Sequence, residues 1–85
     1  MVIVYVLESE VDGTYYVGMT KELTLRIAEH NQGKSKYTSG RRPWKLIYSE
    51  SELDFKTGRA KEKYFKSAAG KKYILKKLSK GSLPD

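Results

Sequence analysis

The segments VIVYVL at residues 2–7 and TYYVGM at residues 14–19 decide the fold of this 85-residue chain. Both are rich in β-branched and aromatic residues, which favour strands. The first segment is apolar at every position, so we expect it to be covered on both faces, in the interior of a sheet. The polar stretch between the two segments ends in Asp12-Gly13, a strong turn signal. Together the two segments predict a β-hairpin.

The rest of the chain predicts three helices and one further strand. The helical segments are residues 21–31, 56–67 and 71–80. Thr20 is suited to cap the first helix, and Ala68-Ala69-Gly70 is expected to separate the second helix from the third. Residues 44–49, WKLIYS, have strand composition, and the glycine-containing basic stretch 32–43 before them is expected to be a loop.

The resulting order, β-β-α-β-α-α, predicts an α/β fold in which a small three-stranded sheet is flanked by helices. A chain of 85 residues has room for one hydrophobic core, so we expect a single domain over residues 1–85. With no cysteine, the sequence excludes disulfides, a thiolate nucleophile and a cysteine-based zinc site. The apolar start is too short for a signal peptide, and no apolar run approaches a membrane span. We therefore expect a cytoplasmic protein with no membrane partner.

Positive charge gathers in the second part of the chain. The net charge is +7. Residues 1–54 hold seven Lys or Arg against eight acids, whereas residues 55–85 hold ten against two. Such an excess favours a polyanionic partner, because each neutralised phosphate releases condensed counterions. The alternative is that these lysines only solvate a helical surface.

The first helix carries two polar residues beside its apolar face. On a helical wheel, Arg26 and His30 stack one turn apart next to Leu23 and Ile27. An arginine at the edge of a buried face is costly unless a partner pairs with it. Alternatively, Arg26 extends past the edge of the core to water, and His30 is a boundary histidine.

The second helix places a single acid at the edge of its apolar face. Glu62 is the only acid between Phe55 and Lys80. Its position fits a carboxylate at the rim of a cleft, able to bind a divalent cation. The alternative is an ion pair with Arg59 or Lys66, each within one turn.

Two tyrosines complete a possible catalytic set. A turn centred on Asp12-Gly13 puts Tyr5 and Tyr16 on one face of the hairpin, although strand tyrosines more often serve packing. A phenol or imidazole can deprotonate or position water, a guanidinium can stabilise phosphate charge, and a cation on a carboxylate can stabilise the leaving oxygen. These are the groups that phosphodiester hydrolysis requires. The candidate residues are Tyr5, Tyr16, Arg26, His30 and Glu62.

Over residues 2–78 the chain resembles the GIY-YIG nuclease superfamily, in particular its short stand-alone bacterial members. The two half-motifs are IVY at residues 3–5 and YVG at residues 16–18. Arg26, SKYT at residues 35–38, RRPWKL at residues 41–46 and AKEK at residues 60–63 follow in order.

The resemblance implies a metal-dependent endonuclease site on a three-stranded antiparallel sheet. By position, Tyr5 and Tyr16 match the motif tyrosines, one of which acts as general base or positions water. Arg26 matches the phosphate-stabilising arginine, and His30 a histidine that assists proton transfer in some relatives. Glu62 matches the carboxylate that holds one Mg²⁺ or Mn²⁺ ion. Gly18 is expected to let the second strand approach the site closely.

Exposed basic residues are expected to contact the nucleic-acid backbone without reading its sequence. They are Lys34, Lys36, Arg41 and Arg42 in the loop, and Lys71, Lys72, Lys76 and Lys77 in the last helix. Tyr37 and Trp44 could stack on a base, although Trp44 is better suited to the core.

The favoured hypothesis is a metal-dependent endonuclease acting on DNA rather than RNA, including structured or damaged DNA in repair or recombination. A protein partner would supply specificity, since the chain carries no separate recognition domain. Two alternatives remain: a non-catalytic DNA- or RNA-binding module with the same fold, and a basic surface that docks an acidic protein.

Overall fold

A three-stranded antiparallel sheet forms the centre of the protein. The structure, a computed structural model, describes residues 1–82. The strands are β1 (Val2–Ser9), β2 (Tyr15–Thr20) and β3 (Trp44–Glu52), in the spatial order β2-β1-β3. The predicted hairpin and the predicted interior position of the first strand are confirmed.

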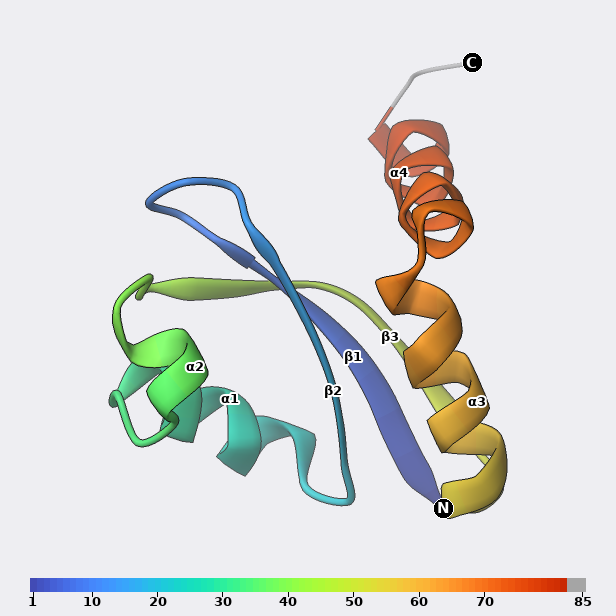
Figure 1. Ribbon diagram of the computed structural model, residues 1–85, viewed down its shortest axis with the longest axis horizontal. Coiled ribbons are helices and arrows are strands. Elements are labelled where there is room, and N and C mark those ends of the chain that lie inside the picture. Colours follow the sequence, from blue (N-terminus) through green and yellow to red (C-terminus); the bar gives the residue numbers. More distant parts are fainter. Residues whose placement is uncertain (83–85) are drawn as a thin grey trace.

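Helices cover both faces of this sheet. They are α1 (Leu23–Asn31), α2 (Lys36–Ser39), α3 (Phe55–Lys66) and α4 (Ala68–Ser82). Helices α1 and α2 lie on one side of the sheet, and α3 and α4 lie on the other (Figure 1). The predicted α/β fold and element order are therefore confirmed, with one addition: α2, a single turn inside the stretch that was expected to be a loop.

Strand β1 separates two hydrophobic clusters. On one face, Val4 and Val6 pack with Phe65 of α3 and Ile74 of α4. On the other, Tyr5 and Leu7 form a cluster with Trp44, against which α1 packs through Leu23 and Ile27. Burial of each large apolar side chain stabilises the fold by about 1.5–3 kcal/mol. The uninterrupted apolar run of β1 thus has a reason, since each face contacts a different pair of helices.

The hairpin register places Tyr5 and Tyr16 on one face, as predicted. Tyr5 pairs with Gly18, and Leu7 pairs with Tyr16. These pairs place the turn centre on Val11-Asp12, one residue before the predicted position. The shift moves each pairing by two residues, so it leaves every side chain on its predicted face.

Two helix boundaries differ from the prediction. Helix α1 begins after Glu22, and Thr20 instead accepts a hydrogen bond from the backbone N–H of Glu22 through Oγ1 at 3.1 Å. Between α3 and α4 the break falls at Ser67, whose backbone is extended. Residues 68–70, expected to be the break, form the first turn of α4.

Among residues 1–82, no helix combines the length and the hydropathy needed to cross a membrane.

Candidate active site

The ring of Tyr5 lies across the edge strand β2 at Gly18. Tyr5 is only 1% exposed. A Cβ atom on Gly18 would lie 2.6 Å from Tyr5 Cζ and 3.0 Å from Tyr16 Cε2, closer than packed atoms approach. Glycine is therefore needed at this position for the space it leaves, because the phenol ring of the neighbouring strand occupies the volume of a side chain.

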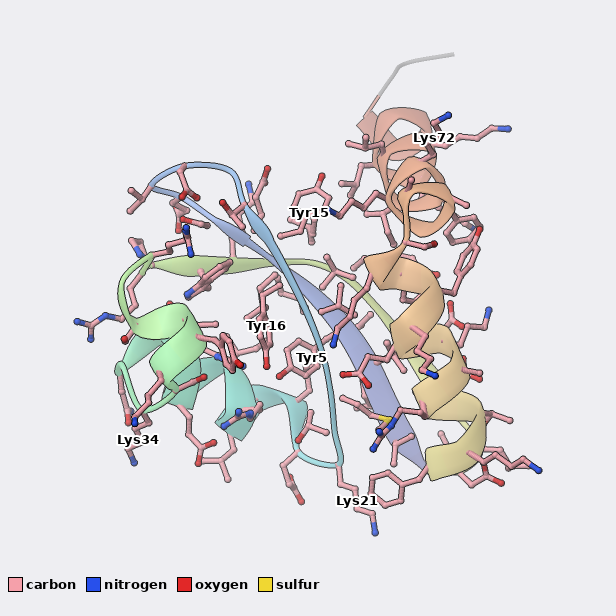
Figure 2. All side chains as sticks on the ribbon, viewed as in Figure 1. Tyr5, Tyr15, Tyr16, Lys21, Lys34 and Lys72 are labelled. Atoms are coloured by element: carbon pink, nitrogen blue, oxygen red, sulfur yellow. The ribbon has the colours of Figure 1, made fainter. Side chains whose placement is uncertain are left out.

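Tyr16 and His30 surround this phenol. The ring centroids of Tyr5 and Tyr16 are 6.3 Å apart, and the Tyr16 ring meets the His30 imidazole edge-on at 4.9 Å. Figure 2 shows the two tyrosines side by side, between the sheet and α1. The two half-motifs and the end of α1 thus meet in one aromatic cluster.

His30 is fully buried, so the interpretation of a boundary histidine is wrong. Its Nε2 lies 2.9 Å from the Tyr5 hydroxyl, and its Nδ1 lies 2.8 Å from Thr38 Oγ1. Burial lowers the pKa of His30 below its usual value, and the positive charge of Arg26 lowers it further. The imidazole is therefore held neutral, with one nitrogen donating and the other accepting.

Thr38 was not singled out in the sequence, yet it anchors this cluster. It is fully buried, and its carbonyl accepts a hydrogen bond from Trp44 Nε1 at 2.8 Å. Asn31 accepts from the Trp44 backbone N–H through Oδ1 at 2.6 Å and donates to the Trp44 carbonyl at 3.1 Å. These bonds join α1, α2 and β3 behind the imidazole. Trp44 itself is in the core, as predicted.

Arg26 has the partner that its position requires. Its Nη1 lies 2.9 Å from Glu29 Oε1, and its side chain is 34% exposed. The guanidinium also acts on the phenol of Tyr5. Burial raises the pKa of Tyr5 to about 12, whereas the positive charge of Arg26 lowers this pKa. Arg26 therefore stands at the half-exposed rim of the cluster, close enough to Tyr5 to stabilise negative charge there.

Glu62 approaches the cluster from α3, on the other side of the sheet. Its side chain is 19% exposed, and its carboxylate lies 3.5 Å from Lys66 Nζ and 3.8 Å from Arg59 Nε. Both ion pairs of the alternative interpretation are thus present. They are long and face water, so each contributes less than about 1 kcal/mol. The negative charge of Glu62 also raises the pKa of Tyr5, which relates this carboxylate to the phenol across the edge strand.

The described residues fit a divalent cation that needs only one protein carboxylate. Within the described part of the chain, no three His, Cys, Asp or Glu side chains come together as a metal cage. Magnesium keeps several waters and is commonly held by one or two carboxylates together with substrate phosphates. A single half-buried carboxylate such as Glu62 suits that mode of binding.

The basic residues fall into two separate groups. All eight are exposed. The loop group (Lys34, Lys36, Arg41 and Arg42) lies around α2, on the side of the tyrosines, and the helix group (Lys71, Lys72, Lys76 and Lys77) lies on α4. Figure 2 shows Lys34 and Lys72 at opposite corners of the molecule. Only the loop group shares the face of the aromatic cluster.

Comparison with known proteins finds similar chains and a matching family model. Residues 1–74 match the family model described as the GIY-YIG catalytic domain. A UPF0213 protein of Halobacterium salinarum is 47% identical over 78 residues, which cover 91% of this chain and 87% of the relative. The UPF0213 protein YazA of Bacillus subtilis is 42% identical over 65 residues, 75% of this chain and 66% of the relative.

A Streptococcus pneumoniae UPF0213 protein is 44% identical over 63 residues, and the match covers 73% of this chain but 63% of the relative's length. The solution NMR structure of a UPF0213 protein from Bacillus halodurans superposes with a TM-score of 0.55 at 32% identity. That superposition covers 89% of this chain and 84% of the other.

Proposed function

The chain belongs to the GIY-YIG family, and from this membership we propose that it is a metal-dependent endonuclease that hydrolyses phosphodiester bonds of DNA. The observation that carries the proposal is the hydrogen bond between the Tyr5 hydroxyl and a fully buried, neutral His30, beside Tyr16 and Arg26. A nuclease-type family implies binding to nucleic acid, and the basic residues near α2 suit the phosphate backbone.

Tyr5 needs His30 in order to act as a base. With a pKa of about 12, the phenol is protonated at neutral pH and cannot accept a proton from water unaided. His30 Nε2 lies 2.9 Å away and can take the phenol proton while the phenol oxygen takes the proton of the attacking water. The imidazole then carries this proton on Nε2 and keeps its original proton on Nδ1, which donates a hydrogen bond to Thr38 Oγ1. Tyr16, in contact with the same imidazole, completes the aromatic wall that positions the water.

Arg26 and Glu62 would stabilise the charge of the scissile phosphate. The guanidinium stands at the rim, positioned by Glu29, where it would bind the non-bridging oxygens of the scissile phosphate. Glu62 would hold one Mg²⁺ or Mn²⁺ ion, whose positive charge would stabilise the leaving oxygen. Its ion pairs with Lys66 and Arg59 are long enough to open when a divalent cation binds.

DNA is favoured over RNA as the substrate, with structured or damaged DNA in repair or recombination as the biological context. The relatives come from bacteria and an archaeon, where DNA lies in the cytoplasm, so this activity would be exercised there. A protein partner would supply target specificity.

A non-catalytic nucleic-acid-binding module with this fold is the second candidate. The observation in its favour is that Glu62 already has two basic partners.

The two candidates are distinguished by whether the protein cleaves the nucleic acid that it binds. We would incubate labelled plasmid, single-stranded, flapped and branched DNA, with matching RNA, in magnesium and in manganese. The variants are Glu62→Gln and, as a matched control, Glu10→Gln in the exposed hairpin loop.

The endonuclease proposal expects cleavage by the wild type and Glu10→Gln, and a loss of at least about 100-fold in Glu62→Gln. Binding without cleavage in either metal would favour the binding module. Failure to bind any nucleic acid at low salt would favour a surface that docks a protein.

A further inference from the structure

Tyr37 is the most exposed large apolar side chain in the part of the protein that the structure describes. Its exposed fraction is 85%, whereas the next residue, Thr38, is fully buried. The ring adds nothing to either hydrophobic cluster, so its contribution to folding is small. A single exposed aromatic ring is common on protein surfaces, and three further observations distinguish this one.

First, the ring is attached to a fixed support. Tyr37 lies in α2, whose Thr38 bonds to His30 at 2.8 Å and to the Trp44 indole at 2.8 Å. His30 in turn bonds to Tyr5 at 2.9 Å. Two hydrogen bonds therefore connect the residue next to Tyr37 with the phenol proposed as the base. A ligand that contacts this ring pays little of the entropy that ordering a loose loop would cost.

Second, the surroundings of the ring are basic. Residues 32–43 contain Lys34, Lys36, Arg41 and Arg42 and no acid, and Arg41 alone among them is ion-paired in the described residues, with Asp12 Oδ2 of the hairpin loop at 2.9 Å. Arg42 is folded over the chain: its Nε donates to the Ser39 carbonyl at 2.9 Å, and its guanidinium packs against the backbone of Gly33. An exposed aromatic ring in a basic segment is the combination that binds single-stranded nucleic acid, where bases stack on the ring and phosphates meet the cations.

Third, another strongly exposed apolar side chain lacks these surroundings. Leu53 is 78% exposed, but it lies between Glu52 and Asp54, whose negative charges would repel a phosphate backbone. The α2 surface is thus distinguished by the sign of its charge as well as by its ring.

We propose that Tyr37 is a stacking platform for an unpaired base, so that the preferred substrate is a strand that is single-stranded or flapped beside the scissile phosphate. The proposal rests on the proposed function for its catalytic meaning, because it names the substrate class of the same site. Base stacking is tolerant of sequence, which agrees with a site that selects strand structure. Both single-stranded DNA and single-stranded RNA offer this chemistry.

The test measures binding in EDTA, so that its outcome does not depend on cleavage. The probes are fluorescent oligo-dT, oligo-U and a DNA duplex of equal length, titrated at two salt concentrations. The variants are Tyr37→Ala and Tyr37→Phe, with Tyr64→Ala as a control on α3, across the sheet. Because Tyr37 is exposed, its replacement leaves the fold intact, which circular dichroism verifies.

Tyr37→Ala is expected to weaken single-strand binding by roughly 5- to 150-fold, the range for loss of one base stack. Tyr37→Phe should restore it, and duplex binding should be unchanged in all variants. Loss with oligo-dT but not oligo-U, or the reverse, identifies the nucleic acid. The proposal is overturned by unchanged single-strand binding in Tyr37→Ala, by an equal loss for duplex, or by a loss in Tyr37→Phe as large as in Tyr37→Ala. A confirmed stack in a protein that cleaves nothing would refute the endonuclease alone.

Discussion

Replacing Gly18 by alanine tests whether the fold depends on the close approach of Tyr5 to the edge strand. The new Cβ atom would lie 2.6 Å from Tyr5 Cζ, about 1 Å closer than carbon atoms pack at their optimum. Tyr5 is 1% exposed and cannot swing into water without leaving its cluster. The ring must shift, and its hydrogen bond to His30 must lengthen or break.

Overpacking of this kind costs about 1–3 kcal/mol of unfolding free energy. Displacement of a catalytic group by about 1 Å lowers the rate by around 100-fold. Urea unfolding followed by circular dichroism measures the first effect, and single-turnover cleavage measures the second. The control is Gly40→Ala, where an added Cβ meets no atom within 4 Å and φ is −80°. That variant should be neutral or stabilised by up to about 1 kcal/mol. Equal stability and equal cleavage in Gly18→Ala and wild type would refute the reasoning.

Three further predictions concern the groups around the phenol. Thr38→Val should cost about 1–3 kcal/mol, because His30 Nδ1 loses its partner in a buried site; urea titration measures this, and a cost near zero would contradict the anchoring role. The pKa of Tyr5 is raised in the fold, so above pH 10 the unfolded chain ionises first, and stability falls by about 2–3 kcal/mol towards pH 12. The pKa of Tyr48 is raised as well, so the contribution of Tyr5 is isolated by comparing the wild type with Tyr5→Phe. The free energy of unfolding should fall more in the wild type than in Tyr5→Phe between pH 9 and pH 11, and an equal fall in both proteins would contradict the prediction. Arg26→Lys should keep the charge but lower cleavage about 10- to 100-fold, because an ammonium lacks the bidentate geometry for phosphate; full activity would show that charge alone suffices.

The hairpin could be predicted from the sequence because its signals are local. The β-branched run at residues 2–7 and the Asp12-Gly13 turn specify two paired strands. The placement of Tyr5 and Tyr16 on one face tolerated an error in the turn centre, because a shift of the centre by one residue preserves the alternation of faces.

The burial of His30 could not be predicted from its helix alone. Its second partner, Thr38, lies in a stretch of glycine, serine and lysine that has the composition of a loop, and α2 is too short to leave a periodic pattern. The partner of Arg26 was easier to predict from the sequence, since Glu29 is three residues further along the same helix.

The separation of the two basic groups also required the structure. The sequence identifies Lys34 and Lys72 as candidates for phosphate binding. The face of the sheet that each helix covers depends on how the chain crosses the sheet, and Figure 2 shows the two lysines far apart. Only the loop group around α2 shares a face with Tyr5 and Tyr16.

The measurement that tests the central claim most directly is metal-dependent cleavage of a flapped DNA by the wild type and by Tyr5→Phe. The substitution keeps the buried ring and removes only the hydroxyl that faces His30. We expect the wild type to cut in magnesium or manganese, and Tyr5→Phe to bind the DNA equally well while cutting at least about 100-fold more slowly. Equal cutting by both proteins, or binding without cutting by the wild type, would contradict the claim that the Tyr5–His30 pair performs phosphodiester hydrolysis.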